Sequence, residues 1–509
     1  MKNEIRSADA GGPPPSNTPG AGAGATARGR RYDAPSWLAI GALALYVAVG
    51  LLGAGGRALV LTFPLGCLLV GLLIFVRSPA TFLTFTFWVW LLTPFIRRIF
   101  DLRYGFHPTS PLLLAPLLVS SVAAITVVRR RMMLRSSAYV PFLVAFVALS
   151  YAYFIGVIRQ SVVSASYDLL TWMAPLLFGL HVALEWRRFP EIRATITSCA
   201  LWGLLVSATY GLVQWVRPPI WDRVWVVSAE MFSIGSPLPY VIRVFSTLNA
   251  PGPFSIMLIF SLLIGLAAPQ RWRSVPLALG IVALVLTKGR SAWAAFLIGA
   301  VVLQIRQPLR ALPRQWVLLV GVVLLAAPLL TQPQVLNLIS RRAGTVANLQ
   351  TDHSYQSRID LTRYALSRMA VNPAGTGLGE LGGASKLLSG GKSAVALDSG
   401  LLEVYSIMGW IGGTLFMMAL FAVTLTVVRA RGNRNQAVAG AVSAVLALMV
   451  TALFGNVFNS ASGFYFWTAV GFATSGRTYT LALEMANRYA HLTPWPGRAI
   501  ASGHTSTAA

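Results

Sequence analysis

The sequence predicts an all-α polytopic membrane protein with about 12–14 transmembrane helices. Of its 509 residues, 56% are apolar and only 11% are charged, whereas soluble proteins carry about 25% charged residues. Most of the length lies in continuous apolar runs, and about 20 such residues cross a bilayer as a helix. The runs do not alternate between apolar and polar residues, which excludes a membrane β-barrel.

About 14 apolar segments follow one another along the chain. They lie near residues 36–53, 58–76, 80–96, 110–128, 138–158, 168–186, 195–216, 250–268, 274–288, 291–305, 314–331, 399–428, 436–456 and 462–476. Residues 1–35 are rich in Gly, Pro, Ala and Ser, which predicts a disordered tail, and residues 489–509 are expected to form another. Between the tails we expect helices at 36–331, a large loop at 332–398 and further helices at 399–476.

Part of the net charge of +26 comes from arginines in the connections between helices. If the N-terminus is cytoplasmic, nearly every short cytoplasmic connection contains arginine, as the positive-inside rule requires. This alternation places both termini in the cytoplasm and three long connections outside, at 97–109, 217–249 and 332–398. These outer connections also contain arginines, among them Arg97 and Arg98. The surplus of arginines in the outer connections favours binding of an anionic ligand such as phosphate. The alternative is that these arginines contact lipid headgroups, and nucleic acid is not needed to explain the charge.

Cysteine and histidine usage predicts neither a disulfide framework nor a metal site. Cys67 and Cys199 both lie inside apolar runs, and the five histidines show no ligand spacing. No metal or other cofactor is therefore expected.

Two stretches in the middle of the chain combine a cation with the start of a helix. Pro251 fits the first turn of a helix, Asn249 is its expected N-cap, and Arg243 would lie near the positive end of that helix. Lys288 and Arg290 occupy the shortest outer turn. Both stretches are candidates for phosphate binding, and the alternatives are an ordinary capped membrane helix and a headgroup anchor.

The large loop contains a predicted helix followed by a glycine-rich turn. A capping-box pattern begins at Ser357, and the helix is expected to end at about Val371 because Asn372-Pro373 follows. Arg358 lies in its first turn, with pairing to Asp360 as the alternative to ligand binding. The turn holds Gly375, Gly377 and Gly379; no strand precedes it, which excludes a dinucleotide site and leaves a flexible hinge as the interpretation.

Three residues are candidates for a catalytic base. Asp398 lies at the start of the apolar segment 399–428, where an acid also favours the helix dipole. Glu403 lies one turn further on, in apolar surroundings, where ionisable residues are functional candidates. His353 is an alternative base.

Taken in order, these stretches resemble the O-antigen ligase and O-antigen polymerase superfamily. The resemblance lies in residues 243–253, in Lys-Gly-Arg-Ser-Ala at 288–292, in the stretch 358–379 and in Asp-Ser-Gly-Leu with Gly-Trp-Ile-Gly at 398–412. It implies a GT-C-like membrane glycosyltransferase with a large extracytoplasmic loop, acting at the outer face of the bacterial inner membrane. It further implies transfer of a glycan from undecaprenyl diphosphate, with Arg243, Arg290 and Arg358 holding the diphosphate.

One departure from the family pattern favours a polymerase over a ligase. The ligases carry His where this chain has Asp398, and an acid at this place resembles the polymerase or exopolysaccharide branch. The resemblance then implies a chain-length regulator and a flippase as partners, and the O-antigen ligase stays the alternative. A transporter is a third hypothesis, from another class; it predicts symmetry between the two halves of the chain, which the sequence lacks.

Overall fold

The apolar runs fold into helices, because a backbone in lipid has no hydrogen-bond partners except its own. The computed structural model of the chain describes residues 34–54, 58–230, 234–306, 353–388, 399–429 and 435–492, with Leu397 and a few residues between 320 and 340. In these residues there are helices and no strand. Eight described helical stretches are long and apolar enough to cross a membrane, and three shorter apolar helices accompany them. The prediction of an all-α polytopic membrane protein is confirmed.

The long stretches come mainly from the first half of the chain. They are α2 (Ala34–Val49), α3 (Leu59–Arg77), α4 (Pro79–Tyr104), α5 with α6 (Leu114–Ser121 and Ala124–Arg129), α7 (Val140–Arg159), α8 (Val162–Leu184), α9 (Phe189–Val216) and α18 (Gly400–Val428). The shorter apolar helices are α11 (Pro251–Leu266), α13 (Arg290–Ile305) and α19 (Gln436–Ala452). Also described are α10 (Ile220–Ser228), α12 (Ser274–Leu286), α16 (His353–Val371), α17 (Gly382–Leu388) and α20 (Ser460–Leu492). Most of the segment expected at 314–331 lies outside the described residues, so the total helix count stays a prediction.

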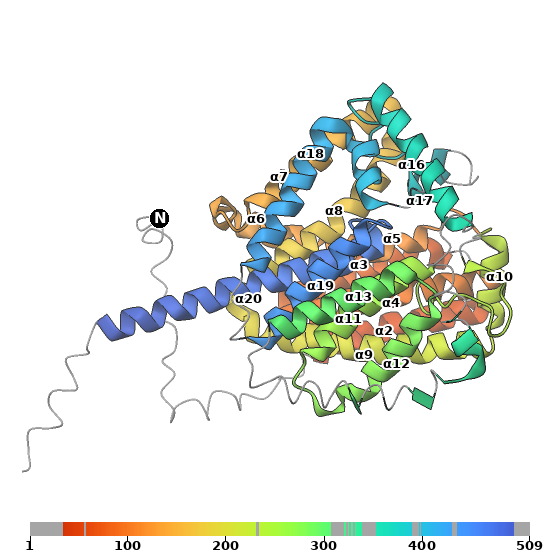
Figure 1. Cartoon of the computed structure of the whole chain (residues 1–509), viewed down its shortest axis with the longest axis horizontal. Helices are drawn as coiled ribbons and strands as arrows, with labels where there is room; N and C mark the ends of the chain where they lie inside the picture. The colour runs from red at the N-terminus through yellow and green to blue at the C-terminus, as the bar shows by residue number, and fades with distance from the viewer. Residues whose placement is uncertain are drawn as a thin grey trace, which may run out of the picture.

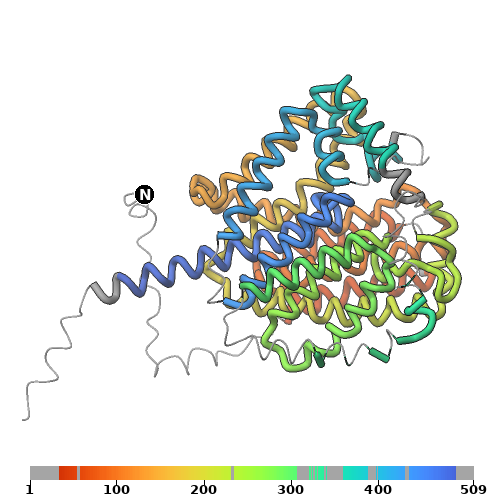
Figure 2. The backbone as a smooth tube through the Cα atoms, in the orientation of Figure 1, coloured from red at the N-terminus to blue at the C-terminus, as the bar shows by residue number. Residues whose placement is uncertain are grey.

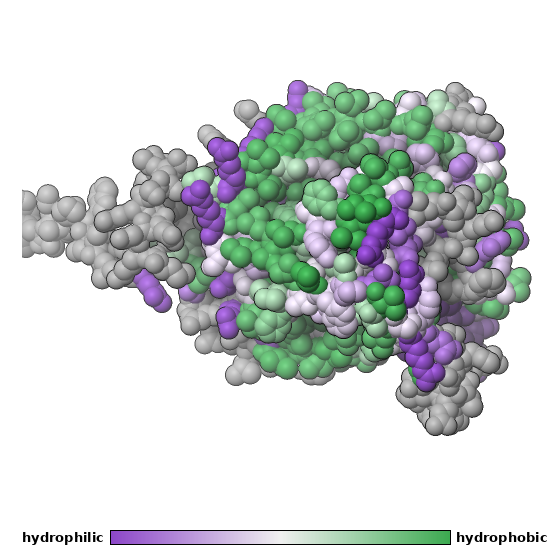
Figure 3. All heavy atoms as spheres, turned by 90° about the horizontal axis from the view of Figure 1, so that it is seen from above, coloured by the Kyte–Doolittle hydropathy of each residue, from purple (hydrophilic) through white to green (hydrophobic). Residues whose placement is uncertain are grey.

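The helices lie side by side, and the segments from the outer connections gather at one end of the bundle. Figure 1 shows α10, α16 and α17 at that end, while α20 runs out past the other end. The trace in Figure 2 shows the same separation between the chain around α16 and the free end of α20. The face seen in Figure 3 is broadly hydrophobic, with hydrophilic residues towards its ends. Large apolar side chains such as Leu69, Ile158 and Phe421 are exposed, as expected for side chains that contact lipid.

Small residues allow the helices to approach one another closely. On α8 and α20, Gly179 and Gly471 face each other so closely that a Cβ on Gly471 would come within 2.1 Å of the Gly179 carbonyl oxygen. On α18, Gly412 packs against the ring of Tyr151 from α7 in the same way. Glycine contacts of this kind are typical of membrane helix pairs, because no hydrophobic driving force acts between helices in lipid.

Several helix ends lie near the positions predicted from the sequence. Two expectations were wrong, the start of α16 and the N-cap of α11. The segment expected at 250–268 is α11, and α16 ends at Val371, directly before Asn372-Pro373. However, α16 begins at His353, four residues before the predicted capping box. The N-cap of α11 is Ala250, with no side-chain cap, so Asn249 does not cap this helix. Asn249 instead lines a cavity, described next.

Candidate active site

A cavity of about 740 Å³ lies where four helices begin. Its lining includes residues from the first turns of α11, α13, α18 and α20. The N-terminus of a helix carries a partial positive charge and unsatisfied N–H groups, so several of them around one space favour an anionic ligand. The cavity is also lined by two acidic side chains, Asp168 and Glu403, which give it a second region with carboxyl groups.

Arg243 lines the cavity and is held by the end of α12. Its Nε donates a hydrogen bond to the carbonyl oxygen of Thr287 at 3.1 Å, and its backbone N–H donates to Ile234 at 3.0 Å. The next turn is tied to the same segment, because Lys288 Nζ donates to the carbonyl oxygen of Val241 at 2.6 Å. The two predicted cationic stretches therefore lie side by side. A guanidinium fixed in this way is suited to bind phosphate oxygens.

A buried ion pair fixes the backbone that carries Arg243. Arg98 Nη1 lies 2.7 Å from Asp222 Oδ1, and both side chains are fully buried. The other carboxylate oxygen of Asp222 accepts hydrogen bonds from Tyr210 and Gln214, each at 2.7 Å. Gln214 Oε1 in turn accepts from the backbone N–H groups of Phe245 and Ser246, at 3.0 and 2.9 Å. Phe245 and Ser246 follow shortly after Arg243, so the hydrogen-bond network fixes the backbone from Arg243 to Ser246.

The expectation that Arg97 and Arg98 form an outer cationic surface was wrong. Because α4 continues to Tyr104, both arginines lie inside a helix and are buried. Arg97 Nε donates to Asp101 at 3.2 Å, its Nη2 donates to the carbonyl oxygen of His107 at 2.6 Å, and its guanidinium stacks on Trp225. These two arginines serve the architecture of the site, because their charges are already paired with acids of the protein.

The acidic region of the cavity brings together residues far apart in the sequence. Glu403, in the first turn of α18, is 7% exposed and accepts a hydrogen bond from Asn459 at 3.4 Å. Asn456 also lines the cavity, close to Glu403. Asp168 on α8 is also buried; its Oδ2 accepts from the backbone N–H of Gly379 at 2.9 Å. A carboxyl group in such a place can accept a proton from a hydroxyl bound in the cavity, and this role of Glu403 stays a prediction.

The glycine turn at 375–379 threads between helices. Gly375, Gly377 and Gly379 have φ angles of +84°, +84° and +103°, which side chains other than glycine rarely adopt. A Cβ on Gly377 would come within 2.2 Å of the backbone nitrogen of Gly156 on α7, and one on Gly375 within 2.3 Å of that of Gly409 on α18. In this structure the three glycines therefore permit close packing, and their opening as a hinge stays a prediction.

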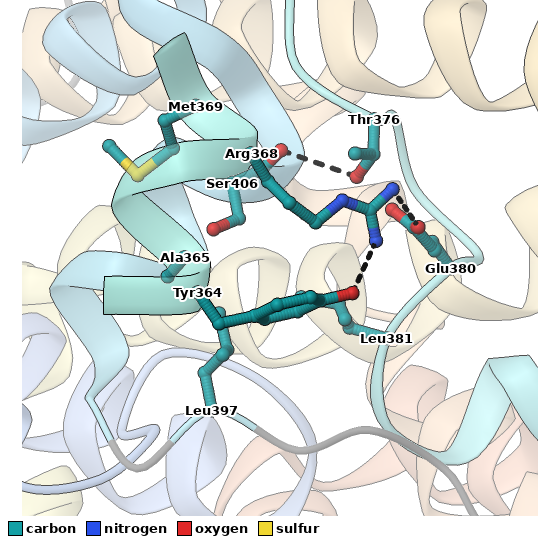
Figure 4. Close-up of a pocket in the computed structure, with 9 residues that line it drawn as sticks. All are labelled: Tyr364, Ala365, Arg368, Met369, Thr376, Glu380, Leu381, Leu397 and Ser406. Carbon is teal, nitrogen blue, oxygen red and sulfur yellow. Dashed lines mark hydrogen bonds and ion pairs between the residues drawn. The ribbon is translucent and has the colours of Figure 1, made fainter. Parts of the chain in front are cut away.

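A small pocket next to the cavity lies where α16 is attached to the glycine turn and α18. Leu381 and Leu397 line both spaces. Figure 4 shows Arg368 reaching from α16 to Glu380, which follows the glycine turn. The distance from Arg368 Nη2 to Glu380 Oε1 is 2.7 Å. Thr376 Oγ1 donates to the carbonyl oxygen of Ser406 at 3.2 Å, so α16, the glycine turn and α18 are joined in one place.

The remaining predicted site residues are only partly described. Arg290 is the first residue of α13, and its neighbours Gly289 and Ser291 line the cavity. His353 and Arg358 lie on α16, in a part whose side chains are outside the description. Asp398 lies outside the described residues; its neighbour Leu397 lines the cavity. Their catalytic and binding roles stay predictions.

Three residues of the cavity were missed by sequence reasoning. Asp168 stands at the edge of an apolar run, and an acid within such a run is a signal that would have found it. Asn456 and Asn459 occupy a short connection without any recognisable pattern, and only the fold brings them to Glu403. Among the described residues no three His, Cys, Asp or Glu side chains meet as a set of metal ligands.

Comparison with known protein families gives one match. Residues 275–417 match the family model described as O-antigen ligase. The matched stretch contains α12, α13, α16, α17 and the first part of α18. The match confirms the resemblance to the O-antigen ligase and polymerase superfamily. No curated protein matches the chain.

Proposed function

We propose that the chain is a polymerase of lipid-linked oligosaccharides, because residues 275–417 match the O-antigen ligase family model. The chain joins repeat units carried on undecaprenyl diphosphate into a surface or exported polysaccharide. One observation carries the proposal: a single cavity contains Arg243, the N-termini of several helices and the buried carboxyl group of Glu403. A group that binds diphosphate and a group that accepts a proton are the two parts that such a transfer needs.

The proposed reaction is a displacement at the anomeric carbon of the donor glycan. A hydroxyl oxygen of the acceptor sugar forms the new bond to this carbon, and the bond from the carbon to the phosphate oxygen breaks. The hydroxyl proton goes to Glu403, and lipid diphosphate leaves with the bonding electrons. Arg243 and the helix N-termini stabilise the charge that develops on the leaving diphosphate. Arg290 and Arg358 are proposed to assist, and Asp398 and His353 are the alternative bases.

The arrangement of helix ends supports an active site at the outer face of the inner membrane. While α13 and α18 begin at the cavity, their other ends lie together, where Arg306 donates to the carbonyl oxygen of Val428 at 2.7 Å. Arg273, beyond the far end of α11, likewise donates to carbonyl oxygens at that end, those of Leu266 and Ala268. The positive-inside rule assigns such arginine-rich ends to the cytoplasm, together with both chain termini.

The O-antigen ligase is the second candidate, and the description of the matched family favours it. It would transfer a finished glycan from the same lipid to another acceptor. A strain lacking the gene separates the two, because loss of a polymerase leaves single repeat units, whereas loss of a ligase leaves full-length polymer on the lipid carrier. An unchanged glycan together with a lost solute-uptake trait would instead favour a transporter and reject both.

Arginine variants test the phosphate site directly. We expect Arg243→Ala and Arg290→Ala to lower polymer synthesis by a factor of about 100 or more, the usual effect of losing one contact to a developing charge. Arg363→Ala is the matched control, because Arg363 is 78% exposed and lies 3.8 Å from its partner Asp360. Glu403→Gln is expected to lose synthesis while keeping donor binding. Polymer of normal length and amount from Arg243→Ala would reject the proposed site.

A further inference from the structure

The turn between α19 and α20 forms an uncharged polar part of the cavity wall. Asn456, Asn459, Ser460 and Ser462 all line the cavity from this turn and from the start of α20. The turn lies beyond residue 417, where the match to the O-antigen ligase family ends. We propose that this turn is the binding subsite for the acceptor sugar, with Asn459 and Asn456 as the side chains that recognise its hydroxyl groups. The inference rests on the proposed function.

The turn is held rigidly against the start of α18. The backbone N–H of Gly400 donates to the carbonyl oxygen of Gly455 at 3.2 Å. Asn456 Oδ1 accepts from the N–H of Phe458 at 2.9 Å, and Trp467 Nε1 donates to the carbonyl oxygen of Phe458 at 3.2 Å. Ser460 has a φ angle of +50°, a strained value for a residue other than glycine that persists only where its surroundings enforce it. A pre-organised wall of this kind is suited to selective recognition.

The amide of Asn459 places a hydroxyl-binding pair beside the proposed base. Its Nδ2 uses one hydrogen on Glu403 Oε1. An Asn side chain has two donor hydrogens and one acceptor oxygen, and within the described part of the chain the second N–H and the amide oxygen make no further hydrogen bond, so they can bind a ligand. A sugar hydroxyl that accepts from this amide can donate its own proton to the neighbouring carboxylate of Glu403. This is the orientation that an attacking hydroxyl needs.

Charge separates the two ends of the substrate within the cavity. The turn lies beside Glu403, and Asp168 lines the same space, so this part of the wall presents carboxyl groups, which offer an anionic diphosphate no attraction. The diphosphate is attracted instead to Arg243, beside Gly289 and the start of α13. A sugar ring carries no charge and suits the amides. Phe454, which also lines the cavity and is 44% exposed, offers the apolar surface that the C–H face of a sugar ring packs on.

Binding of two separate probes to the purified full-length protein tests this division. The probes are inorganic diphosphate and a phosphate-free oligosaccharide released from the cell's own surface glycan, each titrated by calorimetry in lipid nanodiscs. We expect Asn459→Ala to raise the Kd of the oligosaccharide by a factor of about 10, the value of one hydrogen bond, and to leave that of diphosphate unchanged. Arg243→Ala should raise the Kd of diphosphate and leave that of the oligosaccharide unchanged. Asn459→Asp should weaken oligosaccharide binding further, because it places a second carboxylate beside Glu403.

The control variant removes an asparagine at the start of α19, the helix that precedes the turn. Asn435 caps α19 at its N-terminus, where its side chain accepts from the N–H of Ala437 at 3.1 Å. Asn435→Ala should reduce thermal stability while leaving the affinity for both probes unchanged. If lower stability alone weakened binding, Asn435→Ala would weaken the binding of both probes. Misfolding of Asn459→Ala would likewise weaken both probes together, whereas loss of the subsite weakens the oligosaccharide alone.

The outcomes separate the subsite from the proposed function. No oligosaccharide binding by the wild-type protein, or equal binding by Asn459→Ala, overturns the subsite. If the oligosaccharide binds as expected but no glycan is transferred from a lipid-linked donor, the subsite stands and the polymerase proposal fails. If transfer occurs and Asn459→Ala raises the KM of the acceptor alone, both are supported.

Discussion

Replacing Asp222 by Asn should be among the most damaging single changes outside the cavity. The carboxylate lies 2.7 Å from Arg98, and neither side chain is exposed to solvent. The variant keeps the volume but leaves the guanidinium charged in a site that excludes water. Breaking a buried ion pair on one side costs about 3–5 kcal/mol of unfolding free energy. The Asn side chain also has one oxygen acceptor, whereas Asp222 pairs with Arg98 through one oxygen and accepts hydrogen bonds from Tyr210 and Gln214 through the other.

The substitution of Asp222 should also disturb the active site, because Gln214 connects Asp222 to the backbone that carries Arg243. The amide nitrogen of Gln214 donates to Asp222 while its oxygen accepts from the backbone after Arg243. We therefore expect Asp222→Asn to lower glycan synthesis as well as stability, although Asp222 does not line the cavity. The free energy of unfolding is measured by SDS titration in mixed micelles. Asp360→Asn is the control, because Asp360 is 73% exposed and its pairing with Arg363 adds little.

A double variant separates the ion pair from other effects of the substitution. Arg98→Met combined with Asp222→Leu removes both charges, and an apolar pair of similar volume should recover most of the lost stability. The coupling energy from the double-mutant cycle should then be at least about 2 kcal/mol. The reasoning is refuted if Asp222→Asn is as stable as the control, or if the double variant is no more stable than the single one.

Three further predictions follow from the contacts around the cavity. Gly377→Ala should cost about 3 kcal/mol or more of unfolding free energy, because its Cβ would overlap the backbone of α7 at a positive φ angle. Arg368→Ala should release α16 from Glu380, lowering stability by about 1 kcal/mol and raising amide hydrogen exchange along α16. Burial, and next the charge of Arg97, lower the pKa of Lys386, so the unfolded chain binds more protons and stability rises with pH. Lys386→Met should therefore stabilise the protein at pH 7 by up to about 0.5 kcal/mol.

Each of these predictions has its own control. Gly105 also has a positive φ angle, +94°, but open space around its Cβ position, so Gly105→Ala should cost about 1 kcal/mol, the conformational part alone. Equal losses at the two glycines would contradict the packing argument. Arg363→Ala, on the same helix as Arg368, should leave hydrogen exchange unchanged. The advantage of Lys386→Met should vanish as the pH approaches 10.5, the ordinary pKa of lysine, and an advantage independent of pH would contradict the titration argument.

The helices and several of their ends were readable from the sequence because their causes are local. An apolar run must form a helix in lipid, whatever it packs against, and the segment expected at 250–268 is α11. The stop at Asn372-Pro373 depends on the proline itself, which cannot continue the hydrogen bonding of a helix. The stretch around Arg243 was recognisable because its cation and its helix start are neighbours in the sequence. The match at residues 275–417 confirms the family resemblance on which that interpretation rested.

What the cavity contains was decided by the tertiary structure alone. Arg98 and Arg243 were both expected in outer connections, yet Arg98 is paired with Asp222 inside the protein and Arg243 lines the cavity. Arg98 and Asp222 are more than a hundred residues apart in the sequence, and only the fold brings them together. Glu403 and Asn459 meet for the same reason. The length of an apolar run and a helix-breaking proline act within one segment, so the sequence of that segment reveals them. Charge pairing acts between segments and exists only once the segments are packed.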